Sequence, residues 1–468
     1  MGATASTAFA FSVVPGKVLG KDAPSNKLNL AMIGVGGQGG ASMRNEGVRN
    51  ENTVALCDVD LDRAGGHIKT QTRKHPRTKV YRDFRKMFDE MGKDIDAVMI
   101  ATPDHTHYVA AMAAIRRGKH VYCEKPLAHS IYETRKLTEA ARESNVVTQM
   151  GNQGHSSESI RLCCEWIADG ALGDVREVHA WSNRPAGGYA FPASMARPED
   201  APRIPHTLEW DLWLGPAKHR AFHRAYCPIF WRAWLDFGTG ALGDMGCHII
   251  DPAFWALKLG SPLSVEANVA YNANPEFWWP MFDGTKRWKS EIQTYLEAVR
   301  KETYPTASIV RYEFPARGKM PPVKLSWFDG GLLPPRPEGR PKKGLGGNGA
   351  LIIGEKATIM HGSHGAGGCR IIPEEKMQAY ERPAKRLDRV AGGKDGHRQD
   401  WIRACKSGRP ASSSFSYGGP LTELVLLGVI ALRLPNKKLL WDAGKMEFTN
   451  SKEATALVKP EYRKGWSL

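Results

Sequence analysis

Asp244 and His248 are the first candidates for chemistry, because they stand four residues apart in the segment GALGDMGCHIID, residues 240–251. If Asp244 begins a helix, the two side chains are one turn apart and share a face. The ordinary pKa of histidine suits proton exchange near neutral pH, and a nearby carboxylate can fix its tautomer or hold a substrate hydroxyl. The spacing is typical of a general acid–base pair, and equally of a helix with an N-terminal aspartate and a packed histidine.

A second chemical signal lies in the segment Leu28–Gly39, LNLAMIGVGGQG, where an apolar strand runs into the spacing Gly34-x-Gly36-x-x-Gly39. Such a turn lets a pyrophosphate bind to backbone N–H groups. Gly37 and Gln38 lie within the turn and are therefore expected to bind the cofactor as well. A second strand ends at Asp58, 24 residues after Gly34, where a carboxylate can bind both ribose hydroxyls and repel a 2′-phosphate. The pattern predicts a dinucleotide, NAD rather than NADP; the alternative is an ordinary glycine-rich βαβ turn.

Lys125 is the third candidate, because Glu124-Lys125-Pro126 directly follows another apolar strand, at the edge where the nicotinamide would lie. A lysine there can contact both the nicotinamide side and a substrate hydroxyl, and its charge would lower the pKa of a nearby acid–base group or of the alcohol. Pro126 restrains the backbone beside it, with a cis Lys125–Pro126 bond as one way to do so. An isolated Glu-Lys-Pro would otherwise be a solvated turn.

The elements that must position these residues alternate strand and helix from Leu28 to Gln149, which predicts a parallel sheet. In open sheets of this kind, ligands collect at the carboxyl ends of the strands, where the glycine turn, Ala101–His107 and Glu124–Pro126 all fall. The expected strands are 28–33, 53–57, 95–101, 119–123 and 146–150. The expected helices are 60–73, 83–91, 106–117 and 130–142, with helix-like composition also at 40–49.

After Gly151 the pattern changes, because few helices separate the later strands, and this predicts a mainly antiparallel sheet with helices on one face. Its expected strands are 175–182, 262–271, 306–314, 321–328, 350–354, 357–361 and 369–373. Its expected helices are 157–169, 243–258, 396–407 and 420–433, the last two packing back on the body of the protein, and Pro334–Gly349 is an expected surface loop. The expected units are a tail over 1–26, a doubly wound Rossmann domain over 27–150 and an α+β domain over 151–468.

Taken together, GVGGQG, Asp58, TPDHTH (102–107), EKP (124–126), GNQGH (151–155) and the 240–251 segment resemble the Gfo/Idh/MocA family of sugar- and inositol-processing oxidoreductases. The resemblance covers the chain from about Leu28 onward and implies a Rossmann domain followed by an α/β domain with an open, mainly antiparallel sheet. It implies that His248 is the general acid–base, that Asp244 positions substrate and that Lys125 bridges cofactor and substrate. It also implies a sugar or polyol substrate and a homodimer or homotetramer formed through the exposed face of the second sheet.

The remaining site residues follow from their places near these motifs. The expected cofactor-binding residues are Gly34, Gly36, Gly37, Gln38, Gly39, Asp58, Thr102, Pro103, His107, Glu124, Lys125 and Gln153. The expected substrate-binding residues are His155, Arg184, His206, Asp211 and Asp244. Nine of the fourteen Trp residues lie between 181 and 288, where they would line a cleft for sugar rings or simply build the core.

Three functions fit these residues. The leading hypothesis is an NAD-dependent dehydrogenase that moves hydride between nicotinamide and a secondary hydroxyl or ketone of a sugar, glycoside or cyclic polyol. The second is a glycosidase that uses held NAD for transient oxidation and elimination. The third is a non-catalytic regulator that binds NAD and sugar, against which the apparently intact lysine, aspartate and histidine argue.

The composition argues against nucleic acid, membranes and metal ions as binding partners. The formal net charge is +16, with 20 Lys and Arg against 10 Asp and Glu in residues 311–409, which indicates a solvated basic face rather than a nucleic-acid site. No run is long and apolar enough to predict membrane insertion. The eight cysteines are scattered, which predicts neither zinc nor a disulfide framework, and His219 with His223 is only a weak metal pattern, so no metal is expected.

The N-terminal segment Gly2–Val14 is apolar and rich in small residues, like the later part of a secretory signal that lacks its basic leading part. One explanation is a twin-arginine leader whose start lies upstream of Met1, which predicts export to the periplasm. The alternative is a disordered tail on a cytoplasmic enzyme.

Overall fold

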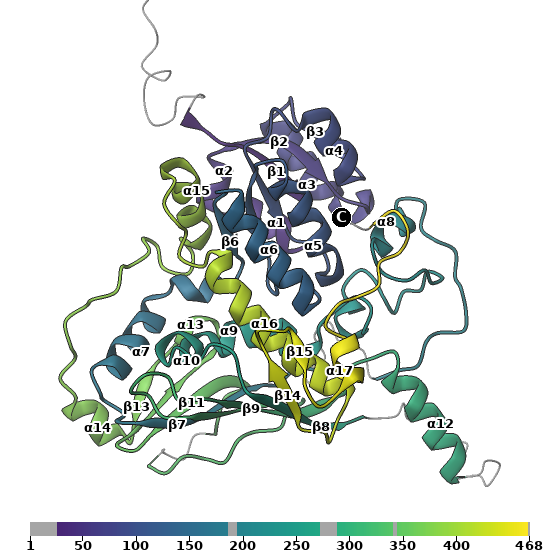
Figure 1. Cartoon of the computed structure of the whole chain (residues 1–468). Coiled ribbons are helices and arrows are strands. Elements are labelled where there is room, and N and C mark those ends of the chain that lie inside the picture. The colour runs from purple at the N-terminus through teal and green to yellow at the C-terminus, as the bar shows by residue number, and fades with distance from the viewer. Residues whose placement is uncertain (1–25, 186–193, 272–287, 340–343, 467–468) are drawn as a thin grey trace, which may run out of the picture.

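The computed structural model describes residues 26–185, 194–271, 288–339 and 344–466. They form two sheet-based units, with the first sheet above the second in Figure 1 and helices packed between the two sheets. The chain therefore has the predicted fold class, a doubly wound parallel sheet followed by a larger, mainly antiparallel one.

The first sheet has six parallel strands in the order β3-β2-β1-β4-β5-β6. Its strands are β1 Asn29–Ile33, β2 Asn52–Cys57, β3 Lys79–Tyr81, β4 Ala97–Ile100, β5 His120–Cys123 and β6 Thr148–Met150. Its helices are α1 Gln38–Met43, α2 Glu46–Arg49, α3 Leu61–Lys74, α4 Phe84–Met91, α5 Asp104–Ile115 and α6 Ile131–Glu143. Because the strand order reverses between β1 and β4, the loops after these two strands open a crevice where a ligand can bind.

The second sheet has nine strands in the order β13-β12-β11-β7-β10-β9-β8-β14-β15. Its pairs are antiparallel except β10 with β7, which run parallel. Its strands are β7 Val175–Ser182, β8 Ser264–Ala270, β9 Ala307–Phe314, β10 Val323–Phe328, β11 Asn348–Gly354, β12 Thr358–His361, β13 Arg370–Ile372, β14 Leu439–Asp442 and β15 Glu447–Phe448. Four helices lie on the face of this sheet that points to the first domain (Figure 1): α7 Glu158–Ala168, α9 Gly240–Ile249, α10 Asp251–Ala256 and α16 Phe415–Arg433.

The other helical segments of the described chain are shorter or lie in connections. They are η3 Gln153–Ser156, α7 Glu158–Ala168, α8 Trp210–Leu214, η4 Phe230–Ala233, α9 Gly240–Ile249, α10 Asp251–Ala256, α12 Trp288–Arg300, α13 Ser363–Ala366, α14 Glu374–Ala379, α15 His397–Ser407, α16 Phe415–Arg433 and α17 Lys452–Ala456.

The predicted helix over 243–258 is two helices in the structure, α9 and α10, which meet at Ile250. Pro252 lies at the start of α10, where its missing N–H group costs nothing, so a new helix begins there instead of continuing the old one. All ten residues of α9 are buried, which fixes the helix that carries Asp244 and His248 inside the protein.

Helix α16 begins at Phe415, five residues before the predicted start at 420, although Pro420 lies inside it. This first turn packs closely on β6, because a Cβ atom at Gly418 would lie 2.9 Å from Cβ of Met150. Contrary to the sequence expectation that no run is long and apolar enough, one described helix, α16, passes this test for crossing a membrane, and 78% of that stretch is buried in the protein. It packs against α6, α9 and β8 as a core helix.

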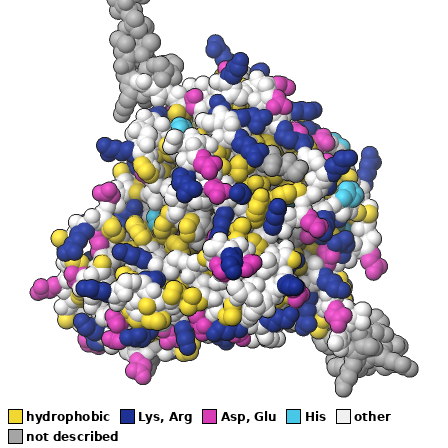
Figure 2. Space-filling model, in the orientation of Figure 1, with side chains coloured by type: hydrophobic (Ala, Val, Ile, Leu, Met, Phe, Trp, Pro, Cys, Tyr) yellow, Lys and Arg dark blue, Asp and Glu magenta, His cyan; other side chains and the backbone are white. Residues whose placement is uncertain are grey.

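Helix α15 lies against the first domain beside α2 (Figure 1). Its Trp401 and Ile402 share one buried apolar cluster with Leu30 and Met32 of β1, so the chain returns to the first domain after completing most of the second sheet. On the visible face of the molecule, Lys and Arg side chains are interspersed with Asp and Glu (Figure 2).

Candidate active site

A cavity of about 470 Å³ is lined by residues of both domains, and the predicted motifs meet in it. The first domain contributes the glycine turn and the loops after β2, β4 and β5, and Gln153 of η3 follows just after this domain. The second contributes Arg184 after β7, Trp231 and Arg232 of η4, Asp244 and His248 of α9, and His364 of α13. Residues that are far apart in sequence are thus brought around one space large enough for a small molecule.

Two positions of the turn can be occupied only by glycine, because neighbouring backbone atoms leave no room for a Cβ atom. Gly34 has φ +82°, and a Cβ atom there would lie 2.7 Å from the carbonyl oxygen of Ala101. A Cβ atom at Gly39 would lie 1.9 Å from the carbonyl oxygen of Gly34, so α1 can pack this closely on the turn only because Gly39 has no side chain. Gly34, Gly36, Gly37 and Gln38 line the cavity, whereas Gly39 supports them from behind.

Asp58 lies in the cavity wall directly after β2, as predicted, but its carboxylate also holds the glycine turn. Oδ2 accepts hydrogen bonds from the amides of Val35 at 2.7 Å and Gly36 at 2.9 Å, and Oδ1 accepts one from the amide of Asp60 at 2.9 Å. Burial raises the pKa of Asp58, although these three amides act in the opposite direction. Each carboxylate oxygen has two lone pairs, so acceptor capacity toward a ribose remains.

His107 ties together the two loops that carry Thr102 and Lys125. Its Nδ1 lies 2.8 Å from the carbonyl oxygen of Pro126, and its Nε2 lies 2.9 Å from that of Thr102. Its ring nitrogens are thus engaged with the backbone, so its contribution to the cavity is to fix the loops. The Lys125–Pro126 bond is cis, and Thr102, Pro103, His107 and Glu124 all line the cavity.

Lys125 of the first domain bonds directly to Asp244 of the second. Its Nζ lies 2.7 Å from Oδ1 of Asp244 and donates a second hydrogen bond of 2.9 Å to the main-chain oxygen of the same residue. Asp244 also forms ion pairs with Arg184 and with Arg232, whose Nε lies 3.5 Å from Oδ1. Burial alone would raise the pKa of Asp244, but the charges of Lys125, Arg232 and Arg184 outweigh it and hold that pKa far below its ordinary range.

His248 lies one turn after Asp244 on α9 and borders the same cavity. Its Nδ1 is buried and makes no hydrogen bond within the described chain. Burial, with the neighbouring His364 and Lys125, lowers the pKa of His248 well below 6.5. The imidazole is therefore neutral at physiological pH, the form that can accept a proton from an alcohol.

His364 is a site residue that the sequence did not reveal. Its ring stacks on that of His248, and its Nδ1 lies 2.8 Å from Oγ of Ser363. It has φ +54° between glycines in HGSHGAGG, and a histidine in such a glycine-rich segment is only a weak signal. Arg232 was also missed, because the irregular aromatic stretch before it shows no helical or strand period.

Family models match both halves of this architecture. Residues 28–152 match the oxidoreductase family model for an NAD-binding Rossmann fold, and residues 191–279 match the same family's C-terminal alpha/beta domain. The chain belongs to the Gfo/Idh/MocA oxidoreductase family. Its first domain is thus an NAD-binding Rossmann fold, as the glycine spacing predicts.

Among curated members of the Gfo/Idh/MocA family, the chain is 29% identical over 172 residues to a levoglucosan dehydrogenase from Pseudarthrobacter phenanthrenivorans, covering 36% of this chain and 35% of that protein. It is 33% identical over 161 residues to an inositol 2-dehydrogenase from Rubrobacter xylanophilus, covering 34% and 44% respectively. The chain thus spans less than half the length of these two relatives. The structure of an inositol dehydrogenase homolog from Azotobacter vinelandii, complexed with NADH and myo-inositol, superimposes with a TM-score of 0.54 at 17% identity, covering 89% of this chain and 98% of that one, which shows a shared fold.

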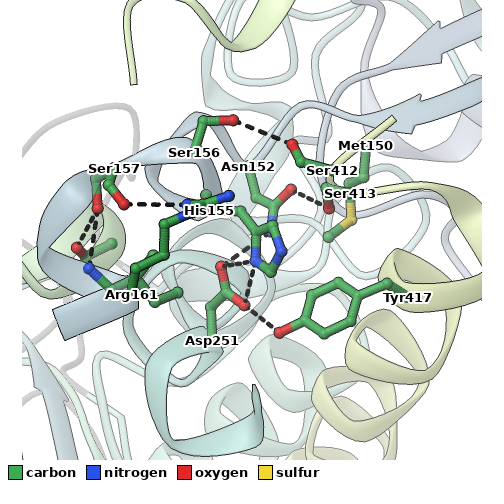
Figure 3. Close-up of polar contacts among 12 residues, drawn as sticks. Met150, Asn152, His155, Ser156, Ser157, Arg161, Asp251, Ser412, Ser413 and Tyr417 are labelled. Carbon is green, nitrogen blue, oxygen red and sulfur yellow. Dashed lines mark hydrogen bonds and ion pairs between the residues drawn. The ribbon is translucent and has the colours of Figure 1, made fainter. Parts of the chain in front are cut away.

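Three predicted substrate residues lie outside the cavity that the family motifs enclose. His155 is buried, with Nδ1 3.1 Å from both carboxylate oxygens of Asp251, and Figure 3 shows this pair joined by Tyr417. His206 is exposed, and Asp211 is exposed and paired with Arg463. The structure therefore does not bring these three residues to the cavity, because local sequence could not show which way each segment faces, and their contact with substrate stays a prediction.

Most of the tryptophans build core, the second of the two alternatives. Trp210, Trp213, Trp231 and Trp234 belong to one buried cluster, of which Trp213 and Trp231 also border the cavity. Trp278 and Trp279 lie outside the described residues. Within the described part of the chain no group of three or more metal-binding side chains occurs, and His223 pairs with Asp200 at 3.4 Å.

Proposed function

We propose that this chain is an NAD-dependent oxidoreductase that transfers hydride between nicotinamide and a secondary hydroxyl or ketone of a sugar, glycoside or cyclic polyol. The observation that carries the proposal is that Lys125, Asp244 and His248 border the same cavity as the glycine turn. The names of the relatives, levoglucosan dehydrogenase and inositol 2-dehydrogenase, support the substrate class.

The residues around the first half of the cavity fit NAD. The glycine turn offers backbone beside which a pyrophosphate fits, and Asp58 offers acceptors for a ribose. The hydroxyl of Thr102 is buried and makes no hydrogen bond within the described chain, so a bound partner would satisfy it. When bound, NAD supplies the hydride acceptor for oxidation and the hydride donor for reduction.

The protein's own residues would manage the proton and the charge. The neutral imidazole of His248 accepts the hydroxyl proton as the C–H bond breaks. The ammonium of Lys125, held by Asp244, stabilises the negative charge that develops on the alcohol oxygen. In the reverse direction, His248 returns the proton to the oxygen of the reduced ketone.

The proposal is tested by assaying the purified protein with NAD⁺ against a panel of sugars, glycosides and cyclic polyols, following reduced nicotinamide by absorbance. We expect NADH formation with at least one of them, and loss of that rate in His248→Ala. Absence of NADH from the whole panel contradicts the proposal. Glycosidic cleavage without net NADH would instead indicate the glycosidase mechanism, and unchanged cofactor-linked function in His248→Ala would indicate a regulator.

Two expectations about context remain part of this proposal. Export through the twin-arginine route depends on Gly2–Val14, which lies outside the described residues. Self-association would use the face of the nine-stranded sheet that points away from the first domain in Figure 1. Periplasmic recovery of the protein from its host and a dimer or tetramer by light scattering are the expected results.

A further inference from the structure

Three basic side chains in the second half of the cavity converge on a single carboxylate. Lys125 and Arg232 approach Oδ1 of Asp244, at 2.7 Å and 3.5 Å, and Arg184 contacts Oδ2. All four residues line the cavity. Among the described residues, Lys125 and Arg232 thus share the single negative charge of Asp244, which leaves a surplus of one positive charge.

This surplus positive charge is partly buried and not fully exposed to solvent. The side chains of Lys125, Arg184 and Arg232 are 15%, 25% and 22% exposed, and that of Asp244 is 7% exposed. Partly buried charges interact more strongly than solvated ones, and like charges held together without compensation are costly. An anion that entered the cavity would relieve this repulsion.

The other described carboxyl groups that line the cavity have partners of their own. Glu124 lies 3.4 Å from Arg398, and Asp104 accepts a hydrogen bond of 2.6 Å from Thr239. Asp58, Asp60 and Asp83 lie on the loops of the first domain, where they bond to backbone amides and, for Asp83, to Arg85. These carboxylates are therefore engaged elsewhere than with the three basic side chains.

Arg232 has a donor that the described chain does not use. Its guanidinium carbon lies 4.2 Å from the ring centroid of Trp231, and one terminal nitrogen donates to the carbonyl oxygen of Ile229 at 3.3 Å. Its Nε is buried without a hydrogen bond, since Asp244 is 3.5 Å away. A planar guanidinium held by an aromatic ring and one carbonyl is well oriented to receive an anionic oxygen.

The pKa values of the two histidines that line the cavity, His248 and His364, are both lowered by the positive charges near them. After burial, Lys125 and Arg184 are among the causes that lower the pKa of both His248 and His364. Burial and the charges of Lys125, Arg184 and Lys394 lower the pKa of His364, and together they outweigh Asp244, which raises it. The region beside the reacting groups therefore favours negative ligands.

We infer that the substrate carries an anionic group, a carboxylate or a phosphate, which Arg232 binds beside the oxidised carbon. This inference rests on the proposed function and narrows its substrate class to acidic sugars such as uronic acids, or to sugar phosphates. Arg184 and Lys125 remain committed to Asp244, so Arg232 is the residue that discriminates charge.

The test is binding calorimetry on the protein loaded with NADH, so that no oxidation occurs during the titration. The probes are matched pairs, glucuronate with glucose and galacturonate with galactose, together with glucose 6-phosphate. We expect an acidic member to bind about 10- to 100-fold more tightly than its neutral partner, the range of one charge-assisted hydrogen bond. Tighter binding of a uronate or of the phosphate identifies which anion the site takes.

Arg232→Gln should reduce that ratio to about 1 to 3, whereas Arg176→Gln, at an exposed arginine outside the cavity, should leave it unchanged. The wild-type ratio decides the matter even if Arg232→Gln fails to fold. Equal or weaker binding of every acidic probe, or no binding of any, overturns the inference. Anion selectivity without NADH formation from the selected sugar and NAD⁺ would overturn the proposed function and leave the anion site standing.

Discussion

The imidazole of His364 stacks on that of His248, with ring centroids 4.1 Å apart and planes inclined by 26°. The two residues come from α13 and α9, which lie against each other although α13 follows β12, the second strand from one edge of the nine-stranded sheet. After burial, His364 is among the causes that lower the pKa of His248. It thereby helps to keep the proposed base neutral.

The first prediction concerns the pH dependence of the wild-type protein. Because the pKa of His248 is lowered, the base stays neutral as pH falls through 6.5 and is protonated only at more acidic pH. We expect kcat/KM for alcohol oxidation to stay constant from pH 8 down to pH 6, where an imidazole of ordinary pKa, about 6.5, would be roughly three-quarters protonated. A steady-state pH profile measures this, and an acid limb centred near pH 6.5 would contradict it.

The second prediction removes the covering ring. In His364→Asn the backbone at φ +54° remains acceptable, because asparagine tolerates this region, but His248 loses its stacked neighbour. The pKa of His248 should then rise toward 6.5, so the acid limb of the pH profile should move to higher pH. Ser363→Ala, which keeps the ring, is the control. An unmoved limb in His364→Asn would show that His364 has no influence on the base.

The third prediction concerns Lys125. In Lys125→Met the developing negative charge loses its ammonium, so kcat should fall about 100- to 1,000-fold, the cost of one preorganised donor. The affinity for NADH, measured by fluorescence titration, should change less than threefold, since the glycine turn and Asp58 are untouched. A large loss of cofactor affinity with little change in kcat would place the role of Lys125 in binding instead.

Much of the fold could be predicted from the sequence, because its strands are apolar and bounded by turn residues. The strand 175–182 has the same bounds in prediction and structure, and the glycine turn, Lys125 and the α9 pair all reach one cavity. Strand β3, which is three residues long and mostly exposed, gave no apolar run to detect. The predicted helix over 243–258 ignored the stop that Pro252 imposes.

Only part of the candidate site could be predicted from the sequence. Sequence spacing shows which residues are neighbours along the chain, but not which residues tertiary packing brings together. Asp244 and His248 are related by one helical turn, which a sequence can show. Arg232 and His364 reach the cavity from irregular segments, and only tertiary packing brings them there. His155 sat close to a strand end and still points into the core, since Asp251 binds it there.

The fourth prediction separates His155 from the substrate. Asp251 is 1% exposed and binds His155, Asn152 and Tyr417 (Figure 3), so His155→Leu leaves a buried carboxylate short of one partner. We expect a loss of about 3–5 kcal/mol in the free energy of unfolding, measured by denaturant titration, with KM unchanged in the folded fraction. Asp211→Asn on the surface should change that free energy by less than about 0.5 kcal/mol. A raised KM with unchanged stability would restore His155 to the substrate site.

The fifth prediction concerns Asp58, which serves both the glycine turn and the proposed ribose contact. In Asp58→Asn, one acceptor oxygen becomes an NH₂ group facing the amides of Val35 and Gly36, or that of Asp60, so the turn loosens whichever way the amide points. The affinity for NADH should fall about tenfold or more, because a charge-assisted hydrogen bond is replaced by a donor–donor contact.

The same carboxylate predicts how the NADH affinity of the wild type depends on pH. Burial raises the pKa of Asp58, so on acidification this affinity should begin to fall at a higher pH than it would with an aspartate of ordinary pKa. Asp89→Asn, at an exposed aspartate outside the cavity, is the control. NADH affinity that is the same in Asp58→Asn as in wild type would mean that neither the turn nor the ribose depends on this carboxylate.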